Sequence, residues 1–215
     1  MLGSYGAEPL CDQNFFDSNS DLASFRKLAF GLTMFHAILL QRRNFGSLGW
    51  NIQYNFTVSD LQISMRQLHH FVDKYDHVPF NALSYLIGDC NYGGRVTEDN
   101  DRKVLNALLE DFMHPKVLEV GYAYGDDKES QYLFPSGENG YHTYIDNIEN
   151  MPDVELPQIF GFHPNADITK NIKQANDLVH ELLKMGEVEG CQPVEEDEPS
   201  SPTEDHNTLN FRSSK

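Results

Sequence analysis

The stretch that decides the fold lies between residues 42 and 56 and reads RRNFGSLGWNIQYNF. It holds the only tryptophan of the chain and three further aromatic residues: Phe45, Trp50, Tyr54 and Phe56. Large aromatic rings gain free energy when they leave water. Gly46 and Gly49 allow backbone conformations that residues with a Cβ resist. We therefore expect a packed corner between two helices, closing a small core around Trp50.

The segment before this corner predicts a central helix that begins at Ser20 or Asp21 and ends near Arg43. Its apolar residues recur at helical spacing: Leu22, Phe25, Leu28, Ala29, Leu32, Phe35 and Leu39. A second apolar face follows from Phe30, Met34 and Ile38. A helix that is apolar nearly all round is buried on most sides.

Three further helices are expected after the corner. Thr57 and Asp60 resemble a capping box for a helix over 59–75. Pro79 and Gly88 bracket a short helix, because proline favours the first helical position and glycine the position past the end. We expect a turn-rich loop over 89–96 and then a helix that Thr97 caps and that ends near Phe112. These four helices predict a small all-α domain over 20–114.

The rest of the chain gives weaker patterns. We expect a loose lead-in over 1–19, a linker over 115–130 and a further segment over 131–185. That segment holds a short helix near 141–150, with Tyr144, Ile145 and Ile148 inward, and an amphipathic helix over 166–185. Residues 187–205 carry eight acidic residues and no basic one, so a disordered acidic tail is expected over 186–215.

The net charge of −17 argues against nucleic acid or an anionic membrane as the partner, since both need a basic surface. The three cysteines, Cys11, Cys90 and Cys191, form no CxxC pair and indicate a reducing compartment. Residues 1–10 do not resemble a secretory signal, and the apolar run 28–40 is short for a membrane span. We expect a soluble cytoplasmic or cytoskeletal protein.

The sequence offers little catalytic chemistry, and we expect no catalytic residue, cofactor or metal. Neither the P-loop pattern nor the dinucleotide-binding glycine pattern is present. His69 and His70 are adjacent, so on a helix their rings diverge and fit one metal ion poorly. Arg95 precedes a helix start that contains Asp99 and Asp101. Their negative charges are expected to interact favourably with the positive end of the helix dipole. We interpret Arg95 as a clamp that bonds to a carboxylate or to carbonyls.

Several irregular motifs of this sequence resemble dynein heavy chains, and they occur in the same order. They are FGL at 30–32, FHA at 35–37, QRRNFG at 41–46, LGWNI at 48–52, YNF at 54–56, CNYGGRVT at 90–97, FPSG at 134–137 and IFGFHPNADI at 159–168. The resemblance covers about residues 14 to 185 and is closest to axonemal, inner-arm-like heavy chains.

By that resemblance, residues 20–114 would be the helical lid of the sixth AAA+ module, and residues 131–185 the start of the C-terminal region. The implied role is structural and mechanical, within a microtubule-based, minus-end-directed motor ATPase of cilia or flagella. The implied partners are neighbouring AAA+ modules, dynein complex subunits and, indirectly, microtubules. The residues expected to form the structural or interaction site are Phe45, Gly46, Leu48, Gly49, Trp50, Asn51, Tyr54, Phe56, Tyr92, Gly93, Gly94, Arg95 and Asp99.

The chain also departs from the family. The Walker motifs, stalk and linker of the motor are missing, the acidic tail does not resemble it, and Asn44, Ser47 and Asn100 stand where the family more often has Lys, Pro and Trp. The chain is therefore interpreted as a fragment, a truncated product or a diverged relative. Two alternatives stay open: a free-standing helical module that binds dynein subunits, and a metal-dependent enzyme using His69, His70 or Cys90.

Overall fold

The computed structural model describes residues 13–18, 21–124, 132–136, 138, 140–151 and 156–188. Within these ranges the chain forms helices and one isolated bridge, between Ala123 and Leu133, which confirms the all-α class. The α-helices are α3 (Gln13–Phe16), α4 (Leu22–Arg42), α5 (Val58–Lys74), α6 (Phe80–Ser84), α7 (Asp99–Phe112), α8 (Tyr141–Glu149) and α9 (Ala166–Val188). Shorter turns of other helix types are η1 (Arg43–Leu48), η2 (Tyr85–Tyr92), η3 (Gly93–Arg95), η4 (Pro115–Leu118) and η5 (Pro157–Phe160). Residues up to Asp177 form one compact unit, and those from Leu178 a second.

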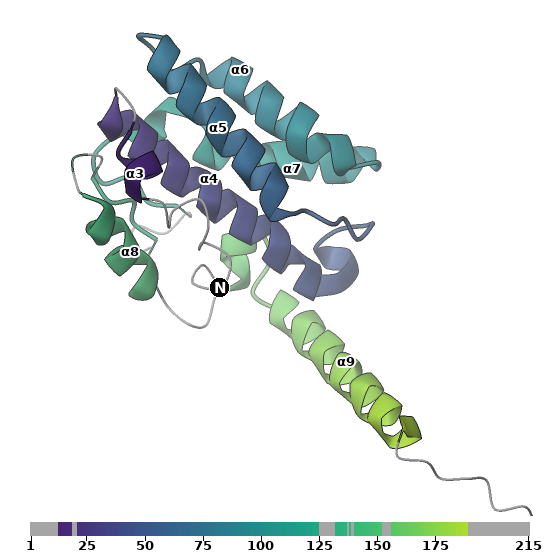
Figure 1. Ribbon diagram of the computed structural model, residues 1–215. Helices are drawn as coiled ribbons and strands as arrows, with labels where there is room; N and C mark the ends of the chain where they lie inside the picture. Colours follow the sequence, from purple (N-terminus) through teal and green to yellow (C-terminus); the bar gives the residue numbers. More distant parts are fainter. Residues whose placement is uncertain are drawn as a thin grey trace, which may run out of the picture. The chain divides into compact units, whose positions relative to one another are not determined.

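Helix α4 is the centre of the first unit, as its apolar pattern predicts. Figure 1 shows it in purple, between α5, α6 and α7 on one side and α8 on the other. The Asp21 side chain accepts a hydrogen bond from the Ser24 backbone N–H at 3.2 Å and caps its start. The segment Ala23–Leu48 is long and apolar enough to cross a membrane, but most of it is buried inside the protein, as in a core helix.

The starts of α5 and α7 test two capping predictions. Thr57 and Asp60 form the expected capping box at α5, with the Thr57 N–H donating to Asp60 Oδ2 at 2.8 Å. The prediction for α7 is wrong by one residue, because Glu98 and not Thr97 is the cap. The Glu98 carboxylate accepts from the Asp101 N–H at 2.7 Å, and a charged acceptor at a helix start is stronger than a hydroxyl.

The predicted end of the short helix at Gly88 is wrong. Helix α6 continues as the π-helix η2 through Gly88 to Tyr92 and then as η3, so residues 89–95 are helical and not a loop. A Cβ at Gly88 would overlap Asn106 of α7. The glycine therefore permits close packing between η2 and α7, and does not end a helix.

Part of the expected loose lead-in is packed. Phe16 is buried, and its ring meets the edges of Tyr141 and Tyr144 with centroids 5.8 and 5.2 Å apart. The ring of Phe15 also lies 5.8 Å from Phe25 and 5.0 Å from His69. The aperiodic pattern of this segment gives no sign of these contacts. The remainder of the predicted lead-in, 1–12 and 19, lies outside the described residues.

Residues 115–124, expected to begin a linker, pack on the core. Val117 and Tyr124 are buried, and the Tyr124 ring lies 4.5 Å from that of Phe112. The Lys27 ammonium donates to the carbonyls of Leu118 and Glu119 at 3.0 and 2.7 Å. The polar composition of this stretch predicts exposure, but its aromatic residues cover α7. Residues 125–131 lie outside the described part.

The later helices follow their predicted ranges closely. In α8 Tyr144 is buried, and Ile145 and Ile148 are half-buried. Helix α9 extends from Ala166 to Val188, three residues beyond its predicted end. The expected disordered tail from residue 189 onward lies outside the described residues.

The packing of residues 115–124 and of Phe134 on the core predicts that a chain cut after residue 114 is less stable than one cut after residue 166. The shorter chain would expose Phe30 and Phe112, whose rings meet Phe134 and Tyr124, and exposed aromatic surface costs free energy. Thermal unfolding of the two truncated chains by circular dichroism measures the difference. Equal midpoints would contradict the packing.

Candidate functional site

The two sequence motifs singled out above meet in space. The rings of Tyr54 and Phe56 lie 5.9 and 5.6 Å from Trp50, and the Tyr92 ring lies 5.8 Å from Phe56. We call these four residues the aromatic corner. All four are buried, and edge-on ring pairs at such distances are favourable beyond their burial. The corner therefore joins the loop after α4 to the end of η2.

The backbone at Trp50 fits closely against the end of α4. The indole Nε1–H donates to the Leu39 carbonyl at 3.2 Å. A Cβ at Gly49 would overlap the Arg42 carbonyl, and Gly46 has a φ of 58°, which residues with a side chain rarely adopt. The two glycines thus allow the loop to turn back onto α4.

Arg42 is the buried cation beneath the corner. Its guanidinium lies 5.2 Å from the Trp50 ring and 4.3 Å from the Phe162 ring, within cation–π range. It donates from Nε to the Gly49 carbonyl at 3.2 Å and from Nη1 to the Phe160 carbonyl. Burial lowers the pKa of Arg42 to about 10, so the side chain stays charged at neutral pH. It connects α4, the loop and residues 160–162.

Asp101 of α7 is the buried anion of the site. Its carboxylate accepts hydrogen bonds from the N–H groups of Asn51 and Ile52 at 3.1 and 3.3 Å and from the Tyr54 hydroxyl at 2.9 Å. The residue is 4% exposed, and a buried carboxylate needs several donors to offset its desolvation. Burial raises the pKa of Tyr54, so its hydroxyl keeps the proton that it donates.

Glu98 adds further hydrogen bonds between the start of α7 and the loop, nearer the surface than those of Asp101. Its carboxylate accepts from the side-chain amides of Asn51 and Asn100 at 3.2 and 3.0 Å, besides capping α7. The backbone hydrogen bond from Asp101 is the main cause that lowers the pKa of Glu98. The start of α7 therefore holds the loop through two carboxylates.

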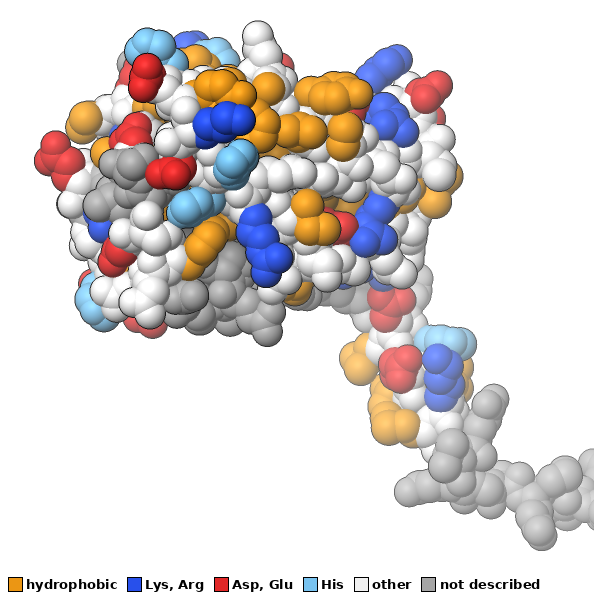
Figure 2. Space-filling view, turned by 45° about the horizontal axis from the view of Figure 1, so that its top comes forward, with side chains coloured by type: hydrophobic (Ala, Val, Ile, Leu, Met, Phe, Trp, Pro, Cys, Tyr) orange, Lys and Arg blue, Asp and Glu red, His pale blue; other side chains and the backbone are white. Residues whose placement is uncertain are grey.

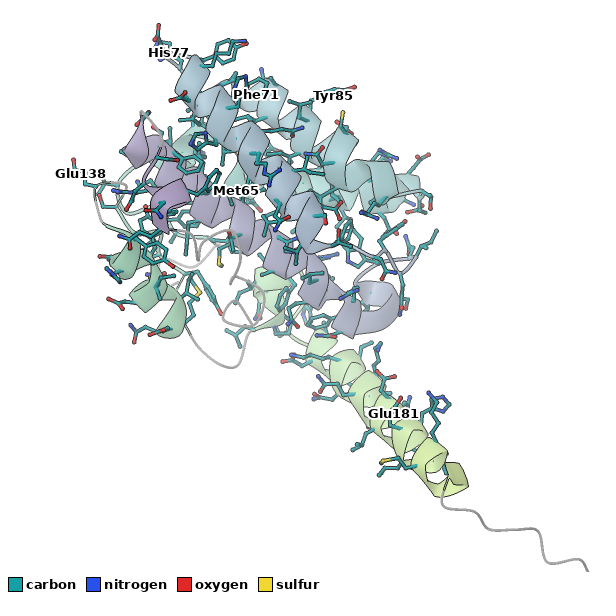
Figure 3. All side chains as sticks on the ribbon, viewed as in Figure 1. Met65, Phe71, His77, Tyr85, Glu138 and Glu181 are labelled. Atoms are coloured by element: carbon teal, nitrogen blue, oxygen red, sulfur yellow. The ribbon has the colours of Figure 1, made fainter. Side chains whose placement is uncertain are left out.

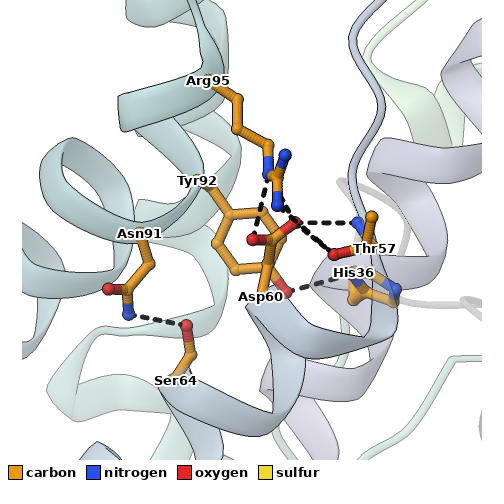
Figure 4. A network of polar contacts seen from close by, with 7 residues as sticks. All are labelled: His36, Thr57, Asp60, Ser64, Asn91, Tyr92 and Arg95. Carbon is orange, nitrogen blue, oxygen red and sulfur yellow. Dashed lines mark hydrogen bonds and ion pairs between the residues drawn. The ribbon is translucent and has the colours of Figure 1, made fainter.

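A second carboxylate clamp holds η3 to the start of α5 (Figure 4). Arg95 Nε donates to both carboxylate oxygens of Asp60, at 3.0 and 2.8 Å, and Arg95 Nη2 lies 3.5 Å from Thr57 Oγ1. The predicted clamp by Arg95 on a carboxylate is thus present. Its partner comes from α5, not from the neighbouring start of α7.

Two further polar pairs tie η2 to its neighbours (Figure 4). His36 Nδ1 of α4 lies 3.0 Å from the Tyr92 hydroxyl, and Asn91 Nδ2 donates to Ser64 Oγ of α5 at 2.9 Å. Burial lowers the pKa of His36 to about 4, so the ring is neutral at neutral pH. Burial likewise keeps the pKa of Tyr92 well above its usual value.

The structure separates the predicted site residues into two groups. Those that are buried or half-buried in or beside the corner are Phe45, Gly46, Gly49, Trp50, Tyr54, Phe56, Tyr92 and Gly93. Arg95 is exposed but bonds to Asp60. Leu48, Gly94 and Asp99 lie exposed, and Asn51 is exposed while its N–H bonds to Asp101.

Sequence reasoning missed Arg42, Asp101, Asp60, His36 and Phe162 as members of the site. The sequence held a signal for two of them. Arg42 is a charged residue at the end of an apolar helix, and Asp101 is a carboxylate close in sequence to Arg95.

The arrangement is suited to holding segments together. Among the described residues no group of three His, Cys, Asp or Glu could hold a metal ion. The His69 ring stacks on Phe15 with centroids 5.0 Å apart, whereas His70 is exposed. The polar groups of the corner bond to each other and to backbone groups, so they brace the bundle.

The buried position of Asp101 predicts that Asp101→Asn lowers the free energy of unfolding by about 1–3 kcal/mol. The substitution replaces one carboxylate oxygen with an NH₂ group, which cannot accept a hydrogen bond, so at least one donor of the loop loses its acceptor. Asp99→Asn is the matched control, and its exposed position predicts a change within about 0.5 kcal/mol. Urea unfolding followed by the fluorescence of Trp50 measures both. Equal effects of the two substitutions would refute the role of Asp101.

His36 predicts a pH dependence of stability. Its pKa is about 4 in the folded chain, against 6.5 ordinarily. The unfolded chain therefore binds more protons between these values. The free energy of unfolding is therefore highest, as far as His36 is concerned, above pH 6.5. It decreases by up to about 3 kcal/mol as the pH falls from 6.5 toward 4. His36→Gln should remove this part of the acid destabilisation in urea unfolding across pH 4–7, whereas an unchanged pH profile would show that His36 is not its source.

The sequence was compared with protein families and with known proteins. The family described as "Dynein heavy chain AAA lid domain" matches residues 25–166. The chain is 45% identical over 183 residues to human dynein axonemal heavy chain 3, and 44% identical over 185 residues to mouse dynein axonemal heavy chain 12. It is 41% identical over 185 residues to human dynein axonemal heavy chain 1.

These alignments cover 85–86% of this chain but only 4–6% of the length of the relatives. The family match covers well over half of the chain and includes the aromatic corner, both carboxylate clamps and residues 115–130. The chain belongs to the dynein heavy chain AAA lid domain family.

Proposed function

We propose that this chain is a non-catalytic, structural and mechanical part of a dynein heavy chain, the helical lid of its sixth AAA+ module. The observation that carries the proposal is the family match over the whole braced bundle. A lid transmits movement only if it behaves as a rigid block, and the ties through Arg42, Asp101 and Arg95 connect α4, α5, α7 and η5 within one unit.

The family match also supports a change in the proposed boundaries. It crosses residues 115–130 and ends at residue 166, where α9 begins. Residues 115–124 pack on α7, and Tyr144 of α8 packs on Phe30 of α4 with ring centroids 5.6 Å apart. We therefore assign residues up to 166 to the lid and place the start of the C-terminal region at α9.

The surface of α5 and η2 is the face that we assign to a neighbouring AAA+ module. Apolar side chains gather over these helices in Figure 2. Ile63 is 49% exposed and Tyr85 61% exposed, and Figure 3 shows Tyr85 pointing outward from the start of η2. An exposed apolar patch of this kind is typical of an interaction surface.

The wider setting follows the names of the relatives, which are axonemal dynein heavy chains. We infer that the chain acts in the cytoskeleton, at the axoneme of a cilium, as part of a microtubule-based motor complex. Its direct partners would be the neighbouring AAA+ modules and dynein complex subunits, and its link to microtubules would be indirect. The alternative of a free-standing interaction module predicts binding to subunits without binding to a module of the ring.

The proposal predicts that the chain binds the large subdomain of the first AAA+ module of human dynein axonemal heavy chain 3 through α5 and η2. Ile63→Glu with Tyr85→Glu should weaken binding at least about tenfold, since each substitution places a charge in an apolar contact. Val120→Glu is the control, because Val120 is 90% exposed and lies outside these helices. Calorimetry or biolayer interferometry measures the affinities.

Two kinds of result would contradict the proposal, one from the binding experiment and one from a nucleotide titration. One is the absence of binding by the unsubstituted chain, or an equal loss with the control variant. The other is micromolar affinity of the chain for Mg-ATP in the same calorimeter, because a non-catalytic lid is expected to bind no nucleotide.

A further inference from the structure

A groove of about 560 Å³ lies between α6 and η2 on one side and the neighbouring helix α7 on the other. Leu109 and Met113 of α7 are buried and form its apolar floor, and the half-buried Phe80 of α6 also lines it. Tyr85 borders the groove and points outward from the start of η2 (Figure 3). A hollow with an apolar floor and a few polar groups is the usual form of a binding site.

Two carboxylates lie close together in this groove. Asp89 of η2 accepts a hydrogen bond through Oδ1 from the side-chain amide of Asn106 at 3.2 Å. Glu110 follows Asn106 by four residues and therefore lies on the same face of α7, one turn further along. Both acids are thus neighbours of Asn106, one across the groove and one along the helix.

The negative charge of the groove is not balanced within the described part of the chain. Neither Asp89 nor Glu110 forms an ion pair with a lysine or arginine of that part, and no lysine or arginine lines the groove. His114 lines it, but its Nδ1 accepts a hydrogen bond from the Lys116 backbone N–H at 3.2 Å. That nitrogen carries no proton, so the ring is neutral. The groove therefore holds two negative charges and no positive one.

We propose that this groove binds an arginine side chain that a docked protein presents. A guanidinium donates to carboxylates in a fixed fork, and Asp89 Oδ2 and both Glu110 oxygens accept no hydrogen bond from the described residues. Its flat face stacks on aromatic rings, which Tyr85 and Phe80 offer. Its methylene stem covers apolar surface such as the floor.

Other kinds of side chain fit the groove less well. An acidic group would be repelled by the two carboxylates, and an apolar one would cover them without supplying a donor. A lysine carries the charge but has neither the fork nor the flat face of a guanidinium. The combination of carboxylates, rings and apolar floor therefore favours arginine.

The groove adjoins the docking face on α5 and η2, because Tyr85 belongs to both. That the arginine comes from a neighbouring AAA+ module rests on the proposed function, whereas the binding of an arginine side chain rests on the groove alone. Two experiments separate these statements.

The first experiment titrates the isotope-labelled 215-residue chain with a blocked alanine pentapeptide that carries arginine at its centre. In NMR spectra, millimolar peptide should shift the side-chain amide signals of Asn81 and Asn106, which line the groove. Citrulline in place of arginine keeps the shape without the charge and should weaken binding at least about tenfold, since charged hydrogen bonds are stronger than neutral ones. The absence of shifts, or equal binding of the citrulline or a lysine peptide, overturns the proposal.

A matched pair of double variants locates the site. Asp89→Asn with Glu110→Gln removes both charges, leaves an acceptor for Asn106, and should weaken binding of the arginine peptide at least about tenfold. Asp99→Asn with Glu119→Gln removes the same charge from exposed positions outside the groove and should leave the affinity unchanged. Thermal unfolding by circular dichroism checks that both variants fold like the original chain. Equal affinities of the two variants would contradict the site.

The second experiment measures the affinity for the large subdomain of the first AAA+ module of human dynein axonemal heavy chain 3. The groove variant, Asp89→Asn with Glu110→Gln, should bind it at least about fivefold more weakly, and the control variant should not. An unchanged affinity of the groove variant would overturn the assignment of the arginine to this module. If the unsubstituted chain does not bind the module at all, the proposed function fails, while the peptide titration still decides whether the groove binds arginine.

Discussion

The buried carboxylate of Asp101 is the interaction on which the corner depends. It holds two backbone N–H groups of the Trp50 loop and the Tyr54 hydroxyl, and it belongs to a helix that lies about fifty residues later in the chain. Without these donors the charge would be costly to bury, and without the charge the loop would lose its tie to α7. The loop is therefore held on both sides, by the Trp50 indole on Leu39 of α4 and by Asp101 of α7.

Arg42 and Arg95 are likewise charged side chains that bond to groups of other segments, at the two ends of the corner. Arg42 bonds to carbonyls of the loop and of η5, and Arg95 holds the start of α5 through Asp60. The bonds from Arg42 to Phe160 and from Arg95 to Asp60 join segments that are far apart in the sequence. The result is a braced bundle in which Arg42 and Asp101 are buried and Arg95 ties two segments together near the surface.

The sequence predicts the helices of the bundle well where local physics decides. The apolar pattern of α4 and the Thr57–Asp60 capping box are examples. It fails where a distant contact decides: Gly88 appears as a stop signal, but the approach of Asn106 on α7 explains it. Tyr124 lies in a polar stretch and is buried by Phe112. For the site, ring size identifies Trp50, Tyr54 and Phe56, whereas the difference between Asp99 and Asp101 depends on a loop that sequence spacing cannot place.

The most direct measurement of the central claim is hydrogen–deuterium exchange of the Trp50 indole N–H, followed by NMR. The indole donates to the Leu39 carbonyl and is buried beneath the corner. It should therefore exchange only through global unfolding, as slowly as the most protected amides of α4. Exchange at the rate of a free indole in the folded chain would show that the corner is open, and would contradict the account.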